Sequence, residues 1–347
     1  MQPSGTGNLA QAHSISVVVP VYQGETTLAP LLAEIAPLTR EFSSPAGHRA
    51  LIVEVLLVHD NGPDASADVM RELAMTYPFV RSIWLSRNFG QHPATLAGMA
   101  SSRGDWIATM DEDGQHDPSY LGAMLDVAMT ERADVVYARP TNTPPHGLAR
   151  NVASNLSKRL LRISTNEVNA TEFQSFRLVL GDIGRGVAEY AGASVYLDVA
   201  MAWVARKIST CPITLRDEGN RKSGYSLRSL VSHFWRMVLS SGTGALRLVS
   251  LVGLIFAAGG FLLALYFVFA KLFGHLTSPA GWPSLITAML VCSGAILFSL
   301  GVIAEYLGVS VNMAMGKPLY LIVSDPAQGP IGRGGRHPAD QPGESAR

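Results

Sequence analysis

From residue 16 to residue 137 the chain alternates short runs of branched apolar residues with stretches whose apolar residues recur at helical spacing. The runs predict strands at Ser16–Pro20, Leu51–Val58, Val80–Leu85, Asp105–Met110 and Ala133–Tyr137. The stretches between them predict helices at Glu25–Glu41, Asp64–Thr76, Pro93–Ser101 and Pro118–Thr130. Continuous apolar strands that alternate with helices are typical of a parallel sheet covered on both faces. Ligands of such sheets bind beyond the carboxyl ends of the strands, so the residues that follow each strand are the first site candidates.

Two long uncharged segments stand in the last third of the chain, at Leu248–Ala270 and Leu276–Ala304. A helix needs about 20 residues to cross roughly 30 Å of hydrocarbon. We therefore expect two membrane-spanning helices, at 248–270 and 284–304, separated by a loop that contains Pro279 and Pro283. Only 16% of the residues are charged, which also argues against a purely soluble enzyme.

The charges around the two segments predict their orientation. Lys271 is the one lysine or arginine between them, whereas Lys317, Arg333, Arg336 and Arg347 follow the second segment. The positive-inside rule then places both termini in the cytosol. The first residues lack the basic and apolar regions of a signal peptide. We expect a multi-pass protein of the cell (inner) membrane whose catalytic domain faces the cytosol.

These features divide the chain into segments. We expect a disordered lead-in (1–13), a cytosolic α/β catalytic domain (14–225), an amphipathic juxtamembrane segment (226–247), the two spans, a cytosolic C-terminal segment (305–325) and a disordered tail (326–347). The juxtamembrane segment mixes Phe234 and Trp235 with Arg228 and Arg236, which suits a membrane interface. An ordinary surface helix packed on its domain is the alternative.

The overall charge and the cysteines exclude several classes of protein. The chain has 27 basic and 27 acidic side chains, which gives no electrostatic reason to expect a nucleic-acid partner. Cys211 and Cys292 cannot build a disulfide framework or a cysteine-rich zinc site. No G-x-G-x-x-G follows the first strand and no G-x-x-x-x-G-K-[ST] occurs, so neither a dinucleotide oxidoreductase nor a P-loop NTPase is supported.

The densest group of acids follows the strand that ends at Met110, in the run D-E-D-G-Q-H-D-P. Asp111 and Asp113 offer the hard oxygen ligands that Mg²⁺ or Mn²⁺ prefers, with positions left open for diphosphate oxygens. Alternatively, the run is a solvated acidic turn in which Asp117 or Pro118 begins the next helix. The location at a strand's carboxyl end favours the metal site.

Two other strand ends carry groups that suit a nucleotide. Tyr22 could stack on a nucleobase, and Asp60 could accept hydrogen bonds from it. Turn chemistry is the alternative for the second segment, because N-G-P-D favours a turn by itself. A basic amphipathic helix predicted at 149–163, after the Pro-rich loop 139–148, suits a phosphate or, alternatively, anionic lipid headgroups.

Taken together, the motifs resemble the family 2 glycosyltransferases with a GT-A fold. In chain order they are P-V-Y-Q-G-E, V-H-D-N-G-P-D, L-S-R-N-F-G-Q, M-D-E-D-G-Q-H-D-P, S-F-R-L, R-K-S-G-Y-S-L-R and E-Y-L-G…G-K-P-L-Y. More narrowly, their order and the two following spans look like the polyprenyl-phosphate hexose synthases, such as dolichol-phosphate mannose synthase and the bacterial undecaprenyl-phosphate glucose and aminoarabinose transferases. The resemblance extends from about Ser14 to Val323. It implies a GT-A α/β fold, a Rossmann-like and mostly parallel sheet, plus two C-terminal transmembrane helices.

The resemblance also implies roles for individual residues. For the metal, Mg²⁺ or Mn²⁺, it implies the ligands Asp111, Asp113 and Gln115. For the nucleotide sugar it implies Pro20, Tyr22, Glu25, Asp60, Asp111, Arg221 and Ser223. For the acceptor phosphate it implies Arg139, Arg150 and Ser154, and as catalytic residues it implies Asp113, Arg177 and Asp198.

This chain departs from the family pattern at several positions. His59 stands where the family usually has the first of two acids, which affects the contact with the base or ribose. Ser175 stands where several members have an acid before F-R-L, and Gly219 and Ser223 are spaced more widely than the usual G-x-S. Asp198 resembles an acid of the aminoarabinose branch near the acceptor, but a structural role is an equal alternative.

The resemblance implies transfer of a hexose from a UDP- or GDP-sugar to polyprenyl (undecaprenyl or dolichyl) phosphate at the cytosolic membrane face. A phosphate monoester has a second pKa of about 6, so its oxygen is already an anionic nucleophile at pH 7. A missing base at Ser175 is therefore tolerable. We expect one in-line displacement that inverts the anomeric centre and yields a lipid-linked donor for glycan or cell-envelope biosynthesis.

Two alternatives stay open. A polysaccharide synthase of the same superfamily would carry Q-x-x-R-W and more spans, and the sequence has neither. A membrane-anchored, non-catalytic nucleotide-sugar-binding or scaffold protein is suggested by His59 and Ser175. The expected partners are a nucleotide sugar, a lipid phosphate and the membrane, and the resemblance also allows a homo-oligomer, since related enzymes include tetramers.

Overall fold

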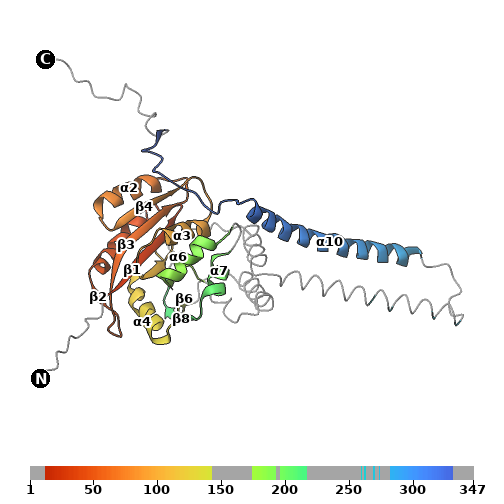
Figure 1. Ribbon diagram of the computed structural model, residues 1–347, viewed down its shortest axis with the longest axis horizontal. Coiled ribbons are helices and arrows are strands. Elements are labelled where there is room, and N and C mark those ends of the chain that lie inside the picture. The colour runs from red at the N-terminus through yellow and green to blue at the C-terminus, as the bar shows by residue number, and fades with distance from the viewer. Residues whose placement is uncertain are drawn as a thin grey trace, which may run out of the picture. The chain divides into compact units, whose positions relative to one another are not determined.

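The computed structural model describes residues 12–142, 174–192, 196–216 and 282–330, together with the single positions 259, 262, 269 and 273. The chain forms two compact units. The first joins residues 1–147, 172–224 and 318–347, and the second joins 148–171 and 225–317. The first unit is an α/β sheet domain, and the described part of the second is dominated by one long helix (Figure 1).

The described residues of the first unit form a mixed nine-stranded sheet. Its strands are β1 (His13–Val21), β2 (Phe42–Ser43), β3 (Arg49–His59), β4 (Val80–Leu85), β5 (Trp106–Thr109), β6 (Val135–Pro140), β7 (Arg177–Leu180), β8 (Ile208–Ile213) and β9 (Ile322–Val323). They are ordered β8-β6-β7-β5-β1-β3-β4-β9, with β2 paired to β3. The four central strands β5, β1, β3 and β4 are parallel, as the apolar runs predicted.

Strand β7 runs antiparallel between β5 and β6. Its first residue, Arg177, pairs with Thr109 near the end of β5 and with Tyr137 in β6. An antiparallel strand starts where its parallel neighbours finish. The start of β7 therefore lies at the same sheet edge as the carboxyl ends of the central strands, and it adds residues 174–177 to that edge.

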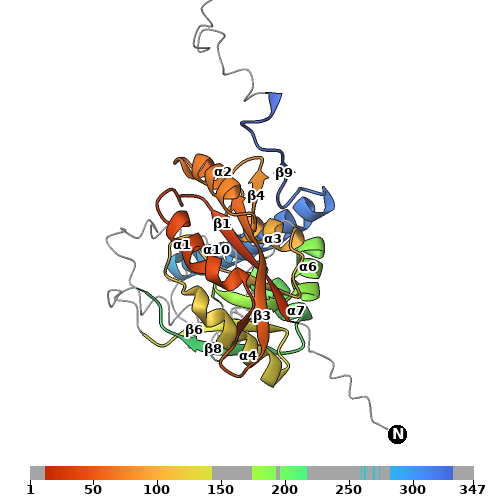
Figure 2. The same ribbon diagram turned by 90° about the vertical axis from the view of Figure 1, so that its left-hand side faces the viewer.

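Helices cover both faces of the sheet. They are α1 (Leu28–Ile35, continued by the 3₁₀ turn η1, Ala36–Thr39), α2 (Ser66–Thr76), α3 (Gln91–Ala100), α4 (Leu121–Glu131, preceded by the 3₁₀ turn η2, Pro118–Tyr120), α6 (Gly181–Tyr190) and α7 (Leu197–Val204). Alternation along β1 sends Val17 and Val19 into the core shared with α1, α2 and α4, and Val18 into the core shared with α3, α6 and α7. Figure 2 shows α1 and α4 on one side of β1 and β3, and α3, α6 and α7 on the other.

The strands and helices predicted up to residue 137 are confirmed, with shifted ends. The lead-in predicted at 1–13 overlaps β1, which begins at His13. The helix predicted at Glu25–Glu41 is α1 followed by η1, since Pro37 in the second position of η1 interrupts the α-helix. The sequence pattern does not predict the strands β2, β7, β8 and β9 or the helices α6 and α7.

The C-terminal segment of the first unit closes an edge of the sheet. Strand β9 pairs antiparallel with β4, and the N–H of Ser86 donates to the carbonyl of Leu321 over 3.0 Å. Covering the unpaired N–H and C=O groups of an edge strand protects it from pairing with another chain. The tail predicted from residue 326 begins inside a turn, in which Gln328 and Gly329 donate to the carbonyl of Asp325. Residues 331–347 lie outside the described part.

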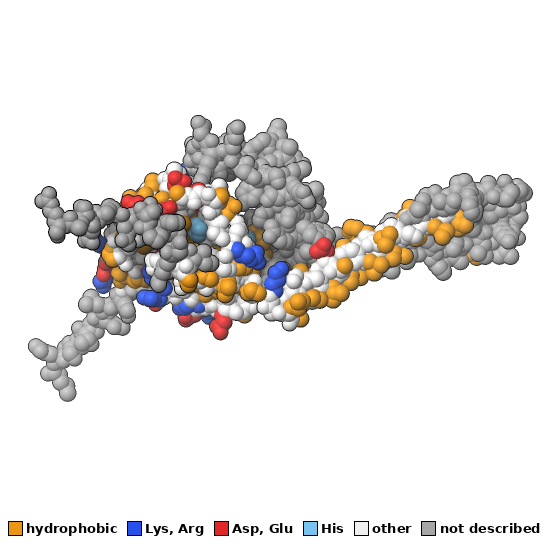
Figure 3. Space-filling view, turned by 90° about the horizontal axis from the view of Figure 1, so that it is seen from above, with side chains coloured by type: hydrophobic (Ala, Val, Ile, Leu, Met, Phe, Trp, Pro, Cys, Tyr) orange, Lys and Arg blue, Asp and Glu red, His pale blue; other side chains and the backbone are white. Residues whose placement is uncertain are grey.

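The second unit contains helix α10 (Trp282–Ala314). Its segment Val291–Ala314 is long and apolar enough to cross a membrane, with a mean hydropathy of 1.8, and Figure 3 shows hydrophobic side chains along the helix. The span predicted at 284–304 lies within α10, but the helix continues ten residues further, from 304 to 314. The uncharged run stops at Glu305, and glutamate is a good helix former that does not end a helix.

The first predicted span has no counterpart among the described residues. Apart from the single helical positions 259, 262 and 269, residues 248–270 lie outside them, as do the juxtamembrane segment 226–247 and the basic helix predicted at 149–163. The described residues therefore hold one candidate membrane helix rather than two.

Candidate active site

The carboxyl edge of the sheet brings together the side chains that the strand ends predicted. Tyr22 follows β1, Asp60 follows β3, and Asp111 follows β5 after one residue. Val21 at the end of β1 lies beside His59 at the end of β3, whereas Thr109 at the end of β5 lies beside Val18, three residues before the end of β1. Pro20 is the second-last residue of β1 and pairs with Val58.

Glu112 ties the loop after β1 to the acidic loop after β5. Its carboxylate accepts a hydrogen bond from the N–H of Tyr22 at 3.0 Å and another from the N–H of Gln23 at 2.9 Å. A Cβ atom on Gly24 would lie 2.7 Å from a Glu112 oxygen, so this glycine leaves room for the carboxylate. Glu112 therefore holds two backbone donors together, a role that its place in the sequence does not predict.

Gly62 brings the loop after β3 against the same segment. A Cβ atom at this position would lie 1.6 Å from the carbonyl oxygen of Tyr22, and the N–H of Asp60 donates to the carbonyl of Val21 at 2.8 Å. The backbone contact needs glycine for steric reasons. It leaves the ring of Tyr22 41% exposed, available to stack on a planar ligand.

Asp60 holds a third loop in place. Its side chain is only 3% exposed, and its two oxygens accept hydrogen bonds from the N–H groups of Phe89 and Gly90, both at 2.7 Å. Burial raises the pKa of Asp60, while these two N–H groups oppose that rise. Both oxygens thus have backbone partners at the start of α3. The predicted contact of Asp60 with a nucleotide stays a prediction.

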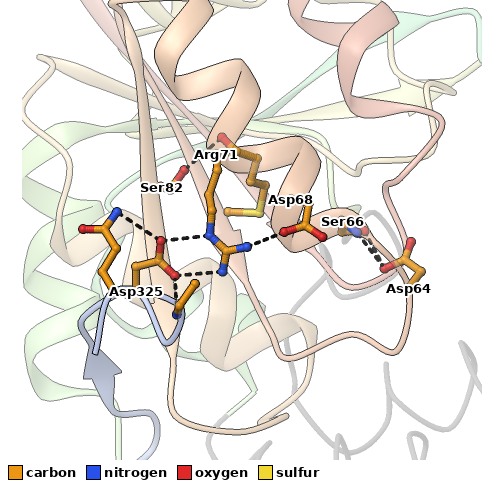
Figure 4. Close-up of polar contacts among 9 residues, drawn as sticks. Asp64, Ser66, Asp68, Arg71, Ser82 and Asp325 are labelled. Carbon is orange, nitrogen blue, oxygen red and sulfur yellow. Dashed lines mark hydrogen bonds and ion pairs between the residues drawn. The ribbon is translucent and has the colours of Figure 1, made fainter. Parts of the chain in front are cut away.

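Glu25 lies at the rim of the same edge. One of its oxygens accepts from the N–H of Ala65 at 3.3 Å, and its own N–H donates to Asp64 at 3.2 Å. The Asp64 carboxylate also accepts from the Ser66 hydroxyl at 2.6 Å (Figure 4). These contacts fasten the loop after β1 to the beginning of α2, and Glu25 stays at the surface where the resemblance places the nucleotide sugar.

Asp111 is anchored from three directions. Gln91 donates from its side-chain nitrogen to one carboxylate oxygen at 2.6 Å, and Ser175 donates from its hydroxyl to the other at 2.5 Å. The N–H of Asp111 donates to Nδ1 of His116 at 3.1 Å. Asp113 accepts a hydrogen bond from the N–H of Gln115 at 3.0 Å. The loop thus presents Asp111, Asp113 and Gln115 from a short, internally bonded turn.

The alternative prediction for the end of this run is confirmed for Asp117. Its carboxylate accepts from the N–H of Ser119 at 2.8 Å and caps η2, with Pro118 in the first turn. It also pairs with Arg216 at 2.8 Å, whose own N–H donates to the carbonyl of Gln115 at 3.1 Å. Arg216 therefore links the segment after β8 to the acidic loop.

The acidic loop fits a divalent cation. No group of three or more histidine, cysteine, aspartate or glutamate side chains suitable for a metal gathers among the described residues. The loop instead offers oxygen ligands for a metal from the carboxylates of Asp111 and Asp113 and from the amide of Gln115. Mg²⁺ is commonly held by one or two carboxylates, with substrate phosphates completing its coordination. The donor set thus suits a cation that binds together with a diphosphate.

Arg177 and Asp198 form a buried ion pair beneath the edge. Each is 3% exposed, and the Asp198 carboxylate also accepts from the Tyr137 hydroxyl at 2.9 Å. Although burial opposes it, the negative charge of Asp198 raises the pKa of Arg177. Such burial and pairing do not suit groups that touch a substrate. The geometry favours the structural alternative for Asp198 over the catalytic one, and it extends that alternative to Arg177.

Of the residues predicted to bind the acceptor phosphate, only Arg139 lies among the described residues. Arg139 is exposed in β6, one residue before its end. Arg150, Ser154, Arg221 and Ser223 lie outside the described residues. Three further residues bond other residues of the site without having been predicted to do so: Glu112, Gln91 and Ser175. Their signal in the sequence was only their position within or beside the strand-end motifs.

Comparison with known proteins gives a consistent assignment. The glycosyl transferase family 2 profile matches residues 16–182. Undecaprenyl-phosphate 4-deoxy-4-formamido-L-arabinose transferase of Photorhabdus laumondii is 28% identical over 90% of this chain and 94% of that protein. The protein of that name from Pseudomonas paraeruginosa is 29% identical over 89% of each chain. The uncharacterized glycosyltransferase YkcC of Bacillus subtilis is 30% identical over 88% of this chain and 92% of that protein.

The family profile extends from β1 to the start of α6. It therefore includes the loops at the carboxyl edge of the sheet that carry the candidate site. The chain belongs to glycosyl transferase family 2 and is a glycosyltransferase built on an α/β sheet domain.

Proposed function

We propose that this glycosyltransferase transfers a sugar from a nucleotide diphosphate donor to a polyprenyl phosphate at the cytosolic face of a membrane. One observation carries the proposal: the acidic loop of Asp111 and Asp113 is bonded through the Glu112 carboxylate to the backbone N–H of Tyr22, whose side chain is exposed. The site belongs to a chain that is similar along about nine-tenths of its length to undecaprenyl-phosphate sugar transferases.

The donor would lie across the carboxyl edge. Tyr22 is exposed for stacking on the base, and the loops held by Glu112 and Asp60 form the floor beneath it. Its diphosphate would meet the oxygens of Asp111 and Asp113. Since two anionic groups repel each other, a divalent cation held by Asp111, Asp113 and Gln115 would join them and stabilise the departing nucleotide diphosphate.

The acceptor needs little help from a general base. A phosphate monoester with a second pKa of about 6 is already an anionic nucleophile at pH 7. What the chain must supply is alignment of that oxygen with the anomeric carbon, and cations are suited to hold it. We assign this task to Arg139, Arg150 and Ser154. A direct attack opposite the leaving group would invert the anomeric centre.

Length, apolar character and charge support placement of the site at a membrane surface. The segment Val291–Ala314 of α10 is long and apolar enough to cross a membrane, and Lys317 follows it. By the positive-inside rule the end of this helix would face the cytosol. A first span at 248–270 would give the two-helix anchor that the sequence predicts.

A transfer assay tests the function. The full chain, purified in detergent, would be mixed with undecaprenyl phosphate, Mg²⁺ or Mn²⁺ and a panel of UDP- and GDP-sugars. Asp113→Ala would be the inactive variant, and Asp182→Ala, on the exposed surface of α6, the matched control. We expect a lipid-linked sugar from the wild type and the control alone, with inverted configuration.

The other outcomes separate the alternatives. Transfer with retained configuration, or a trapped glycosyl-enzyme, would refute the single displacement. Nucleotide-sugar binding without transfer to any lipid phosphate would refute the proposed acceptor. Neither binding nor transfer would favour the scaffold alternative, whereas extension of a polymer would favour a polysaccharide synthase.

A further inference from the structure

We infer that Ser175 is a positioning residue: together with Gln91 it fixes the Asp111 carboxylate in the orientation that receives a divalent cation. The inference rests on the proposed function, because it assumes that Asp111 is a metal ligand. It goes beyond that function in two ways. It assigns the orientation of Asp111 to two residues outside the acidic loop, and it assigns the position of Ser175 to the buried Arg177–Asp198 pair.

Ser175 and Gln91 approach Asp111 from different elements. The Ser175 hydroxyl, just before β7, donates to Oδ2 at 2.5 Å, and the Gln91 amide, at the first position of α3, donates to Oδ1 at 2.6 Å. A carboxylate has about four lone-pair positions. Two neutral donors fix its plane while leaving other positions for a cation, and they leave its negative charge in place.

Ser175 is itself fixed by buried groups. Its carbonyl accepts from the Thr109 hydroxyl at 2.6 Å, and Thr109 Oγ1 accepts from Nε of Arg177 at 3.0 Å. Arg177 is in turn paired with Asp198. This chain of contacts leads from the ion pair under the sheet edge to the hydroxyl on Asp111, so the pair sets the position of Ser175 without touching a ligand.

The partners of Asp111 come from outside the acidic loop. They are side chains from α3 and from the segment before β7. Hydrogen bonds to a ligating carboxylate fix its orientation, and their removal typically weakens metal binding about 10- to 100-fold. Ser175 and Gln91 are in the right places to act in this way on Asp111.

The test measures Mn²⁺ binding without turnover. The full chain in detergent would be titrated with Mn²⁺ alone, and free Mn²⁺ would be followed by electron paramagnetic resonance. We expect the dissociation constant to rise about tenfold in Ser175→Ala and in Gln91→Ala. Ser175→Thr, which keeps the hydroxyl, should restore binding to within about threefold of wild type, which a loss of packing alone would not explain.

Ser101→Ala is the matched control. Ser101 is another partly buried serine, and its hydroxyl donates one hydrogen bond, to the carbonyl of Ala97 at the far end of α3. Its removal should leave Mn²⁺ binding unchanged. Melting temperatures of all variants within about 2 °C of one another would show that the sheet domain is intact. Gln91 is exposed, so Gln91→Ala tests the inference even if Ser175→Ala is unstable.

The outcomes separate this inference from the proposed function. Wild-type Mn²⁺ affinity in both alanine variants would overturn the inference while leaving sugar transfer intact. Failure of the wild type to bind Mn²⁺ would overturn it as well. If Mn²⁺ binding depends on Ser175 but the wild type glycosylates no lipid phosphate, the proposed acceptor would be refuted and the role of Ser175 would stand.

Discussion

Arg71 on α2 and Asp325, 254 positions later in the chain, are joined by two hydrogen bonds of 2.9 and 2.8 Å (Figure 4). The guanidinium also lies over the Trp84 ring of β4, 4.8 Å from its centroid. The segment that follows α10 is thus fastened to the sheet domain by β9 and by this ion pair.

Replacing Asp325 should loosen that attachment. A hydrogen bond to a charged group contributes about 1.5–3 kcal/mol to stability. Asp325→Asn should therefore raise the rate at which this segment opens locally from the sheet roughly tenfold. Hydrogen exchange at β4 and at residues 319–329 measures this directly. Asp182→Asn, which breaks the exposed pair with Arg185, should change nothing there. Unchanged exchange in Asp325→Asn would mean that β9 alone holds the segment.

The attachment made by the Arg71–Asp325 ion pair should not change with pH near neutrality. The hydrogen bonds from Arg71 lower the pKa of Asp325, although burial opposes this. A carboxyl with a lowered pKa stabilises the folded form above its ordinary value near 3.9 and loses that effect as the pH falls through the lowered value. The attachment should therefore persist from pH 8 to 5 and weaken only below about pH 4, as the same exchange measurement would show.

Glu112→Gln should impair donor binding more than folding. Each carboxylate oxygen accepts one backbone N–H, and an amide nitrogen would face one of them as a second donor. We expect the loop that carries Tyr22 to shift, with KM for the nucleotide sugar rising about tenfold and Tm falling by less than about 3 °C. Glu41→Gln, at an exposed pair with Arg49, is the control. An unchanged KM would show that the two hydrogen bonds accepted by Glu112 do not shape the donor site.

The sequence could predict those parts of the fold in which one element carries its own pattern. Strands β1, β3, β4, β5 and β6 are buried on both faces, so each appears as an apolar run. Strand β7 has four residues and begins with the charged Arg177, and β9 has two. Such short strands exist only because neighbours pair with them, and local sequence does not record that pairing.

The site shows the same limit. The strand-end rule correctly placed Tyr22, Asp60 and Asp111 at one edge of the sheet. It could not say which acids serve the protein's own backbone. Glu112 and Asp60 are used in that way because the loops after β1 and β4 need acceptors for their N–H groups. That requirement depends on the path of each loop, which one sequence does not reveal.

Asp198→Asn should be strongly destabilising. Removing one charge of a buried pair leaves the other uncompensated, which costs about 3–5 kcal/mol. For a domain of this size we expect Tm to fall by roughly 10 °C. The double variant Arg177→Met with Asp198→Leu removes both charges and should recover at least half of that loss. If the single variant melts like wild type, the pair is not a structural centre, and the catalytic assignment of Asp198 regains support.

His59 should make the sheet domain less stable in mild acid. Burial lowers the pKa of His59, and the nearby charge of Arg71 reinforces this, whereas Asp64 and Asp325 oppose it. The ring packs on Trp84, and its Nε2 has no hydrogen-bond partner among the described residues. The unfolded chain gains this proton near pH 6.5 and the folded chain only at lower pH, so stability falls as the pH drops below about 7. The difference in Tm between pH 7.5 and 5.5 should be about 2–3 °C smaller in His59→Phe. An equal difference would contradict the assignment to His59.

Gly62→Ala should damage the site at its narrowest backbone contact. The added methyl group would lie 1.6 Å from the carbonyl oxygen of Tyr22, so the loops after β1 and β3 must separate. We expect the affinity for the nucleotide sugar to fall at least tenfold, measured by calorimetry. Gly186→Ala is the matched control: it lies within α6 with nothing near a Cβ atom, and it should leave affinity unchanged while stabilising the helix by about 0.5–1 kcal/mol. Equal affinity in both variants would mean that the Tyr22 loop takes no part in donor binding.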